Sequence, residues 1–212
     1  MSARRRSPSI RCPWEIDMSA VLEARSSDGG SERPSVTAFL VCAVAAVLRD
    51  FPDVNGSYED GRIKLNDDVN VGVAVGTDSQ ASSFRSSDVR TTRVSRDVAA
   101  ELTALRADAD AGRPRLDQMT SGTFNHPNLG MHGIDVFTAI VNSARRRRSW
   151  PLVASVGRRR DKARSTDHRG GRVWVTLSVD HRAVDGARGA RFLSAIKTAL
   201  EGSSVGQTVV RS

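Results

Sequence analysis

The sequence of 212 residues predicts an α/β protein, and the prediction rests on two recurring patterns. Short segments of alternating or β-branched apolar residues are typical of strands. Between them lie longer segments whose apolar residues recur every three or four positions, as on the buried face of a helix. Residues 173–200 show both patterns in succession. The length suits one large domain with a sizeable core.

The first half of the chain begins with residues 1–9, a charged segment with Ser and Pro that we expect to be a disordered basic tail. Residues 12–18 predict a strand, followed by a short helix at 19–25 with Asp17 or Ser19 near its cap. The clearest helical pattern spans 35–49, and the Pro, Asp, Asn and Gly of 51–56 predict the turn that ends it.

The second half continues the alternation of strands and helices. Strands are predicted at 61–65, 69–76 and 152–157, and an amphipathic helix at 95–111. Residues 79–90 are too polar for a buried strand, so they predict an exposed edge or a loop.

Composition narrows the class of protein. Hydrophobic residues make up 39% and charged residues 26%, which is ordinary for a soluble globular protein. No run approaches the roughly 18 apolar residues of a membrane span, and the basic N-terminus lacks the apolar core of a secretory signal. We therefore expect a cytoplasmic protein that does not bind membranes. The spacing of Cys12 and Cys42 fits neither a zinc site nor a disulfide framework, so we expect unpaired cysteines and no metal.

The turn between the strand and the helix of 173–200 reads His181-Arg-Ala-Val-Asp185-Gly186. A histidine at a strand end, before a tight turn with a carboxylate and a glycine, is placed where a base can face a cleft. The alternative is a polar turn in which Asp185 caps the helix and Gly186 supplies an unusual backbone angle. These residues alone leave both interpretations open.

Two segments carry a resemblance to a known family. Residues 180–193, DHRAVDGARGARFL, resemble the His-x-x-x-Asp-Gly signature of the catalytic domain of dihydrolipoyl acyltransferases from 2-oxo acid dehydrogenase complexes, a domain related in fold to chloramphenicol acetyltransferase. Residues 121–142 resemble the family's Gly-Gly-Thr-Phe-Thr-Ile-Ser-Asn-Leu-Gly-Met segment and its continuation. The resemblance runs from about Trp14 to Glu201, with breaks at 79–94 and 143–150.

The resemblance implies a chloramphenicol acetyltransferase-like, two-layer sandwich, with helices packed on a mixed β-sheet, over residues 10–202, followed by a C-terminal tail at 203–212. It also implies a homotrimer with active sites between subunits. The family's lipoyl domain and its apolar C-terminal tail have no match in this sequence. We therefore expect a freestanding catalytic domain that assembles no further than the trimer.

The activity that the resemblance implies is transfer of an acyl group between coenzyme A and a thiol such as dihydrolipoamide. The acyl-CoA is a substrate, a lipoyl domain is one candidate carrier of the thiol, and no tightly bound cofactor is expected. His181 is the implied general base, because an imidazole pKa of about 6.5 lies close enough to a thiol pKa of about 8.5 for reversible proton transfer. Asp185 is implied to fix the turn. The family's N-terminal helix, whose arginine can pair with this aspartate, has no match, which leaves Arg182, Arg188 or a less ordered turn.

The donor for the oxyanion of the thioester departs from the family pattern. Pro127 stands where the family has a serine, and proline offers neither a hydroxyl nor a backbone N–H. Loss of one oxyanion donor costs about a hundred- to a thousandfold in rate. Two alternatives follow: another residue supplies the donor, or the chain is a catalytically impaired homologue acting as a structural or interaction subunit. A freestanding acyltransferase with a different acceptor is a further alternative. The candidate donors are Asn125, His126, Asn128 and Thr123.

The net charge of +8 comes largely from arginine runs at 4–6, 145–148 and 158–160. Clustered arginines neutralise phosphates, which favours nucleic-acid binding. No nucleic-acid-binding module is recognisable, however, and Tyr58 is the one tyrosine of the chain. Solvated loops explain the runs as well, as does attraction to the phosphates of coenzyme A or to an acidic carrier domain. We expect no nucleic-acid partner.

Overall fold

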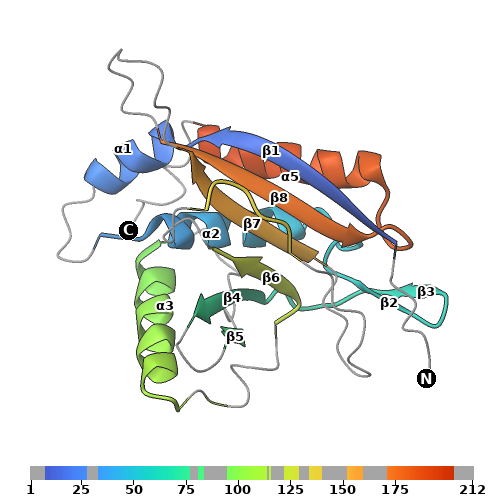
Figure 1. Ribbon diagram of the computed structural model, residues 1–212, viewed down its shortest axis with the longest axis horizontal. Helices are drawn as coiled ribbons and strands as arrows, with labels where there is room; N and C mark the ends of the chain where they lie inside the picture. Colours follow the sequence, from blue (N-terminus) through green and yellow to red (C-terminus); the bar gives the residue numbers. More distant parts are fainter. Residues whose placement is uncertain are drawn as a thin grey trace.

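The computed structural model describes residues 8–27, 33–76, 81–83, 95–113, 115, 122–128, 134–139, 152–159 and 171–202. Within these ranges a six-stranded sheet runs in the order β1-β8-β7-β6-β4-β5 (Figure 1). Its strands are β1 (Ser9–Asp17), β4 (Val71–Gly76), β5 (Ala81–Ser83), β6 (Phe124–Pro127), β7 (Leu152–Arg159) and β8 (Arg172–Asp180). The helices are α1 (Ser19–Ser27), α2 (Val36–Leu48), α3 (Ser95–Asp110) and α5 (Gly186–Glu201).

The sheet is mixed. β8 pairs antiparallel with both β1 and β7, whereas β6 runs parallel to β7 and to β4, and β5 returns antiparallel along β4. Helices α2 and α5 pack against one face of the sheet, and α2 also contacts α1 and α3 (Figure 1). The predicted arrangement of helices on a mixed sheet is therefore confirmed. β5 lies at the sheet edge, as expected for this polar segment, and residues 84–94 lie outside the described residues.

Helix α2 forms the centre of the core. Almost all of its residues are apolar, and those between Ala38 and Leu48 are buried on nearly every side. Ser35 caps it, with its hydroxyl accepting a hydrogen bond from the Ala38 N–H at 3.2 Å. The prediction of a helix at 35–49 is confirmed, because the apolar pattern is strong and the cap is local.

Three aromatic rings join the helices to the sheet. Phe192 of α5 lies 5.4 Å from Phe51, just after α2, and 5.9 Å from Phe124 of β6, measured between ring centroids. All three side chains are buried. The first turns of α5 are therefore packed against the loop that follows α2, which is the loop that approaches the His181 turn.

The N-terminal strand and its helix follow the sequence prediction, but the boundary of the tail does not. The Asp17 carboxylate accepts hydrogen bonds from the Ser19 N–H at 2.8 Å and the Ser19 hydroxyl at 2.5 Å, and so holds the start of α1. Ser9 already pairs with Asp180 across β1 and β8. The tail boundary expected at residue 9 therefore falls inside β1, because β8 offers backbone partners along the whole segment. Residues 1–7 lie outside the described residues.

A two-stranded hairpin, β2 (Ser57–Glu59) and β3 (Arg62–Lys64), follows α2. Its loop residues Asp60 and Gly61 both have positive φ angles, 48° and 84°. Asp-Gly is a favoured dipeptide for such a loop, because both residues tolerate this backbone region. The sequence prediction placed only the second strand, although the Asp-Gly pair was a signal for both.

Both cysteines of the chain lie among the described residues. Neither Cys12 nor Cys42 is part of a disulfide bond, as predicted, and burial raises the pKa of Cys42 to about 12. Of the helices that the structure describes, none is long and apolar enough to span a membrane. Across the same residues no group of His, Cys, Asp or Glu side chains is arranged to hold a metal ion.

Candidate active site

The turn that carries His181 connects the end of β8 to the start of α5. The carbonyl of Asp180 accepts hydrogen bonds from the backbone N–H groups of Ala183 at 3.0 Å and Val184 at 3.1 Å. The buried Val184 side chain anchors the turn in the core. The carbonyl of Pro8 accepts a hydrogen bond from the His181 N–H at 2.8 Å. The backbone of the turn is thus fixed on both sides.

The residues on either side of His181 form an ion pair. The Asp180 carboxylate, whose side chain is 8% exposed, accepts hydrogen bonds from Nε of Arg182 at 2.9 Å and from its Nη2 at 2.5 Å. The Arg182 guanidinium also lies 4.4 Å from the centroid of the Tyr58 ring. His181 itself is exposed, and no described residue hydrogen-bonds its imidazole. The Asp180 side chain is thus buried, whereas that of the next residue, His181, is exposed.

Asp185 is the N-cap of α5. Its carboxylate accepts a hydrogen bond from the Arg188 N–H at 2.7 Å, and its backbone is extended. The guanidinium groups of Arg182 and Arg188, the two arginines considered as partners of Asp185, pair with the carboxylates of Asp180 and Asp53. The interpretation of 181–186 as a polar turn correctly predicted that Asp185 caps the helix.

Gly186 differs from its expected role. Its φ is not positive, because it is the first residue of α5 and takes helical backbone angles. A Cβ added there would meet no atom within 4 Å. The unusual backbone angle predicted for Gly186 is therefore wrong, and the described residues place no conformational demand for glycine at this position.

Arg188 reaches from α5 to the loop after α2. Its Nε donates to both Asp53 carboxylate oxygens, at 3.1 and 2.8 Å, and its Nη2 donates to Asp53 Oδ1 at 2.6 Å and to the Asp50 carbonyl at 3.3 Å. The guanidinium lies 4.2 Å from the centroid of the Phe51 ring. The hydrogen bonds from Arg188 lower the pKa of Asp53 below its ordinary value and, in return, raise the pKa of Arg188.

Sequence reasoning missed this loop as part of the site. Residues 51–56 were predicted to be a turn after a core helix, which they are, but Asp53 also binds an arginine 135 positions away. Tyr58 of β2 similarly contacts Arg182. No local pattern marks either partner. The available signal was that Phe51, Asp53 and Tyr58 lie close together in the sequence, just after a predicted core helix.

Of the oxyanion candidates on β6 and just after it, two lie on the helix side of the sheet. Phe124 contacts Phe192 of α5, and His126, two residues further along the strand, shares that face. The His126 side chain is 0% exposed. Asn128 donates from Nδ2 to the Thr37 hydroxyl of α2 at 3.0 Å. The His126 side chain is therefore directed into the protein, and the partly buried Asn128 side chain is directed toward α2.

Thr123 and Asn125 lie on the alternate positions. The Thr123 hydroxyl accepts a hydrogen bond from the Asn70 N–H at 2.9 Å and donates to the Asn70 carbonyl at 3.2 Å, so it links the starts of β4 and β6. Asn125 pairs with Val153 of β7, which pairs with Ser178 of β8. Two strand spacings separate Asn125 from Ser178, about 10 Å. Pro127 lies further still from His181, because β6 and β8 run in opposite directions.

The described residues of one chain thus bring together the turn 180–188 and the loop 50–58. They do not place a candidate oxyanion donor against the His181 imidazole. The segments 129–133 and 140–150, which complete the second motif and include the arginine run 145–148, lie outside the described residues, as does the run at 4–6.

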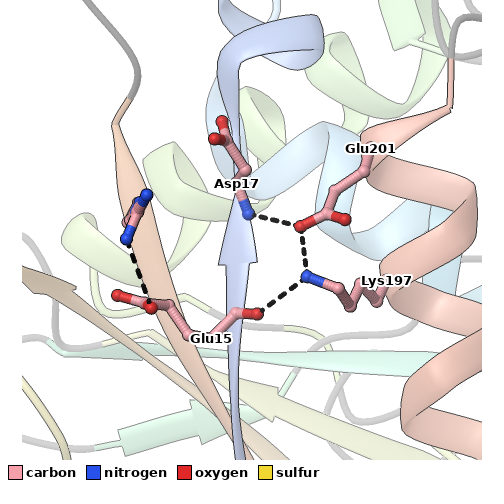
Figure 2. Close-up of a pocket in the computed structure, with 5 residues that line it drawn as sticks. Glu15, Asp17, Lys197 and Glu201 are labelled. Atoms are coloured by element: carbon pink, nitrogen blue, oxygen red, sulfur yellow. Dashed lines mark hydrogen bonds and ion pairs between the residues drawn. The ribbon is translucent and has the colours of Figure 1, made fainter. Parts of the chain in front are cut away.

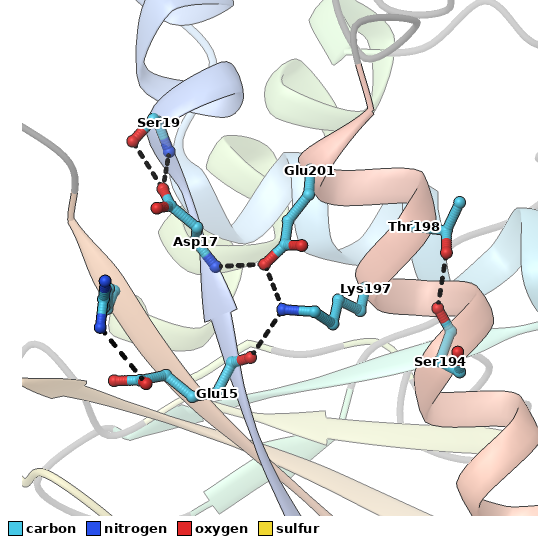
Figure 3. A network of polar contacts seen from close by, with 8 residues as sticks. Glu15, Asp17, Ser19, Ser194, Lys197, Thr198 and Glu201 are labelled. Carbon is cyan, nitrogen blue, oxygen red and sulfur yellow. Dashed lines mark hydrogen bonds and ion pairs between the residues drawn. The ribbon is translucent and has the colours of Figure 1, made fainter.

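A separate cluster of charges lines a pocket at the other end of α5 (Figure 2). Nζ of Lys197 donates to the Glu201 carboxylate at 2.5 Å and to the Glu15 carbonyl at 3.2 Å, and the Asp17 N–H donates to the same carboxylate at 2.7 Å. Arg172 and Glu15 form an ion pair at 3.5 Å. Figure 3 shows that these contacts join α5 to β1. We refer to Glu15, Asp17, Arg172, Lys197 and Glu201 as the β1 edge cluster.

Known proteins resemble this chain in both sequence and structure. Residues 1–205 match the family model described as 2-oxoacid dehydrogenases acyltransferase (catalytic domain). The sequence is 30% identical over 200 residues to the dihydrolipoyllysine-residue acetyltransferase component of the pyruvate dehydrogenase complex from Rickettsia bellii, covering 91% of this chain and 46% of that protein. The chain therefore spans less than half the length of this relative, and the other relatives show similar or smaller shares.

Solved structures support the fold. A truncated catalytic core of the 2-oxoacid dehydrogenase multienzyme complex from Thermoplasma acidophilum aligns with a TM-score of 0.79 and 25% identity, over 93% of this chain and 88% of that one. A chloramphenicol acetyltransferase aligns with a TM-score of 0.61 and 15% identity, over 92% of this chain and 90% of that chain. At that identity the second likeness shows the fold alone. The predicted chloramphenicol acetyltransferase-like fold is confirmed.

Proposed function

Because the chain belongs to the family of 2-oxoacid dehydrogenase acyltransferase catalytic domains, we propose that it transfers an acyl group between coenzyme A and a thiol such as dihydrolipoamide. The relative from Rickettsia is named for a dihydrolipoyllysine residue, which supports a lipoyl thiol as the acceptor class. A lipoyl domain carries that thiol in this proposal. The acyl-CoA acts as a substrate, and no metal or tightly bound cofactor takes part.

In the proposed reaction His181 is the general base. Its imidazole removes the proton from the acceptor thiol, and the thiolate attacks the carbonyl carbon of the acyl-CoA thioester. The resulting oxyanion collapses, the bond to the coenzyme A sulfur breaks, and the protonated imidazole returns the proton to that sulfur. Each step is reversible, because imidazole and thiol have similar proton affinities.

The observation that carries this proposal is the setting of His181. The imidazole is exposed, while the backbone on both sides of it is fixed by hydrogen bonds, and its neighbours Asp180 and Arg182 are ion-paired with each other. A base needs this combination of an accessible ring and a fixed main chain, because a proton-transfer geometry is sensitive to small displacements. A turn with only a structural role has no need for an accessible imidazole.

The proposal includes a homotrimer in which a second chain completes the site. Within one chain the described donors on β6 lie two strands away from β8, so a donor for the oxyanion has to come from another subunit or from elsewhere in the chain. A solved relative with a TM-score of 0.78 forms the cubic core of a pyruvate dehydrogenase multienzyme complex, which supports assembly of such domains. Size-exclusion chromatography with light scattering tests this, since a trimer has three times the mass of one chain.

The activity is tested with acetyl-CoA and dihydrolipoamide, following the release of the coenzyme A thiol. We expect turnover by the wild-type protein and a loss of about a hundred- to ten thousandfold in kcat for His181→Ala, typical of removing a general base. The melting temperature of His181→Ala should match the wild type, because the replaced side chain is exposed. Absence of turnover would reject dihydrolipoamide as the acceptor, and equal rates for the two proteins would reject His181 as the general base.

Pro127 favours one rival, a homologue that keeps the fold as a structural or interaction subunit. Pro127 lies in β6 opposite Ala74 of β4 and has no hydroxyl or N–H to offer. The rival predicts that no thiol acceptor supports turnover. Repeating the assay with a panel of thiols separates this rival from an acyltransferase with a different acceptor, which would be active with one of them.

A further inference from the structure

Arg188 makes more contacts to the loop after α2 than any requirement of helix capping explains. Its guanidinium binds the Asp53 carboxylate through two nitrogens, donates to the Asp50 carbonyl and lies 4.2 Å from the centroid of the Phe51 ring. A planar guanidinium that satisfies a carboxylate, a carbonyl and an aromatic face at once has one preferred orientation. Arg188 therefore fixes the distance and direction between the start of α5 and residues 50–53.

The backbone of Arg188 also contacts the last residue of the His181 turn. The N–H of Arg188 donates to the Asp185 carboxylate, which ends the turn, while the Arg188 side chain holds the loop. At the start of the turn, Arg182 pairs with Asp180 and contacts Tyr58, eight residues after Asp50. The segment 50–58 thus contacts both ends of the turn through one arginine at each end.

Stability alone does not explain the Arg188–Asp53 pair. Both side chains are 29% exposed, so solvent screening limits what the pair contributes to the free energy of folding. Catalytic rates respond far more strongly than stability to the position of a reacting group. The contacts are therefore better matched to positioning than to folding.

We propose that Arg188, held by Asp53 and Phe51, is a positioning residue that orients the turn carrying His181 for proton transfer. This rests on the proposed function, in which His181 is the base. Arg188 acts through the turn and does not touch the substrate in this proposal. The Asp185 carboxylate accepts a hydrogen bond from the backbone N–H of Arg188. The Arg188 side chain pairs with Asp53, and in this proposal that pair holds the turn in place of an arginine bound to Asp185.

The test compares Arg188→Gln, Asp53→Asn and the double variant with the control Arg191→Gln. Arg191 is an exposed arginine on the same helix, one turn further on, and makes no ion pair with any described residue. We expect each of the two single variants to lower kcat about ten- to a hundredfold with little change in KM, and the double variant to be no worse than either single variant. Arg188→Lys should keep part of kcat, because it retains the charge but loses the planar fork.

A second measurement does not depend on turnover. In protein labelled with ¹⁵N-histidine, the ring resonances of His181 should shift in Arg188→Gln and Asp53→Asn, but not in Arg191→Gln. Unchanged His181 resonances in both variants would overturn the positioning role, as would a kcat within about twofold of the control. If the wild-type protein shows no His181-dependent turnover, the proposed function fails, and the resonances alone decide whether Arg188 orients the turn.

Discussion

Helix α5 has a charge network at each end, and the two networks have different surroundings. Near its start, Arg188 pairs with Asp53 beside a turn that exposes a histidine. Near its end, Lys197 and Glu201 pair with each other and bind the backbone of β1 (Figure 3). The shortest N–O distances, 2.6 and 2.5 Å, and the partial exposure of the side chains are similar in both. The partners differ: side chains of a loop at one end, and main-chain groups of an edge strand at the other.

The β1 edge cluster has a complete structural explanation. β1 is an edge strand of the described sheet, so the Asp17 N–H and the Glu15 carbonyl point away from β8 and would be open to pairing with another strand. Glu201 and Lys197 cover these two groups. Pro13, two residues before Glu15 and so in the same orientation, has no N–H to offer. Asp53 and Arg188 do not cover the edge of a strand. We therefore assign a positioning role only to the ion pair at the start of α5.

Asp180→Asn should have the largest effect on stability, because it changes the most buried of these carboxylates. Removing the charge leaves the Arg182 guanidinium without its bidentate partner. We expect a loss of about 1–3 kcal/mol in the free energy of unfolding, measured by urea denaturation, together with a lower kcat. The matched control is Asp110→Asn, whose pair with Arg106 is more than half exposed on both sides and should be worth less than about 0.5 kcal/mol. If Asp180→Asn and Asp110→Asn lost equal amounts of unfolding free energy, burial would not explain the contribution of the Asp180–Arg182 pair.

Substitutions of Asp185 test whether the start of α5 requires a helix cap or a negative charge. Asp185→Ala removes the acceptor for the Arg188 N–H and should lower the free energy of unfolding by about 1 kcal/mol. Asp185→Ser retains a cap without the charge, so it should recover most of that stability and most of kcat. If serine restores stability but leaves kcat at the alanine level, the carboxylate has a role beyond capping. Thermal denaturation and steady-state kinetics of the three proteins distinguish these results.

The sequence predicts the elements of this fold well where their signals are local. Helix α2 has a continuous apolar pattern and a Ser35 cap, and it was placed within one residue at each end. The strand that became β7 and the helix that became α3 were found in the same way. β2 was missed because Ser57–Glu59 directly follows the predicted turn and has no alternating apolar pattern, whereas the next strand has Ile63 and Leu65 at alternate positions.

The site was less predictable, because its contacts depend on tertiary register. His181 and Asp185 were located through a short motif at a strand end, and the cap by Asp185 is a local interaction. The pairing of Arg188 with Asp53 joins residues 135 positions apart, and no periodicity encodes it. The faces of β6 also depend on register: the alternation that sets Phe124 against Phe192 also directs His126 inward, where it is fully buried.

Glu201→Gln should have the smallest effect and is the direct test of the division between the two ends of α5. Glutamine keeps an oxygen that can accept from the Asp17 N–H, but it loses the charge that attracts Lys197. Because both side chains are about one-third exposed, the expected loss is under about 1 kcal/mol, with kcat unchanged. Glu201→Leu removes the acceptor as well, leaves the edge of β1 uncovered, and should produce concentration-dependent association in light scattering. A fall in kcat for Glu201→Gln as large as that for Arg188→Gln would mean that α5 transmits any disturbance along its length, and the positioning role would not belong to its first turn.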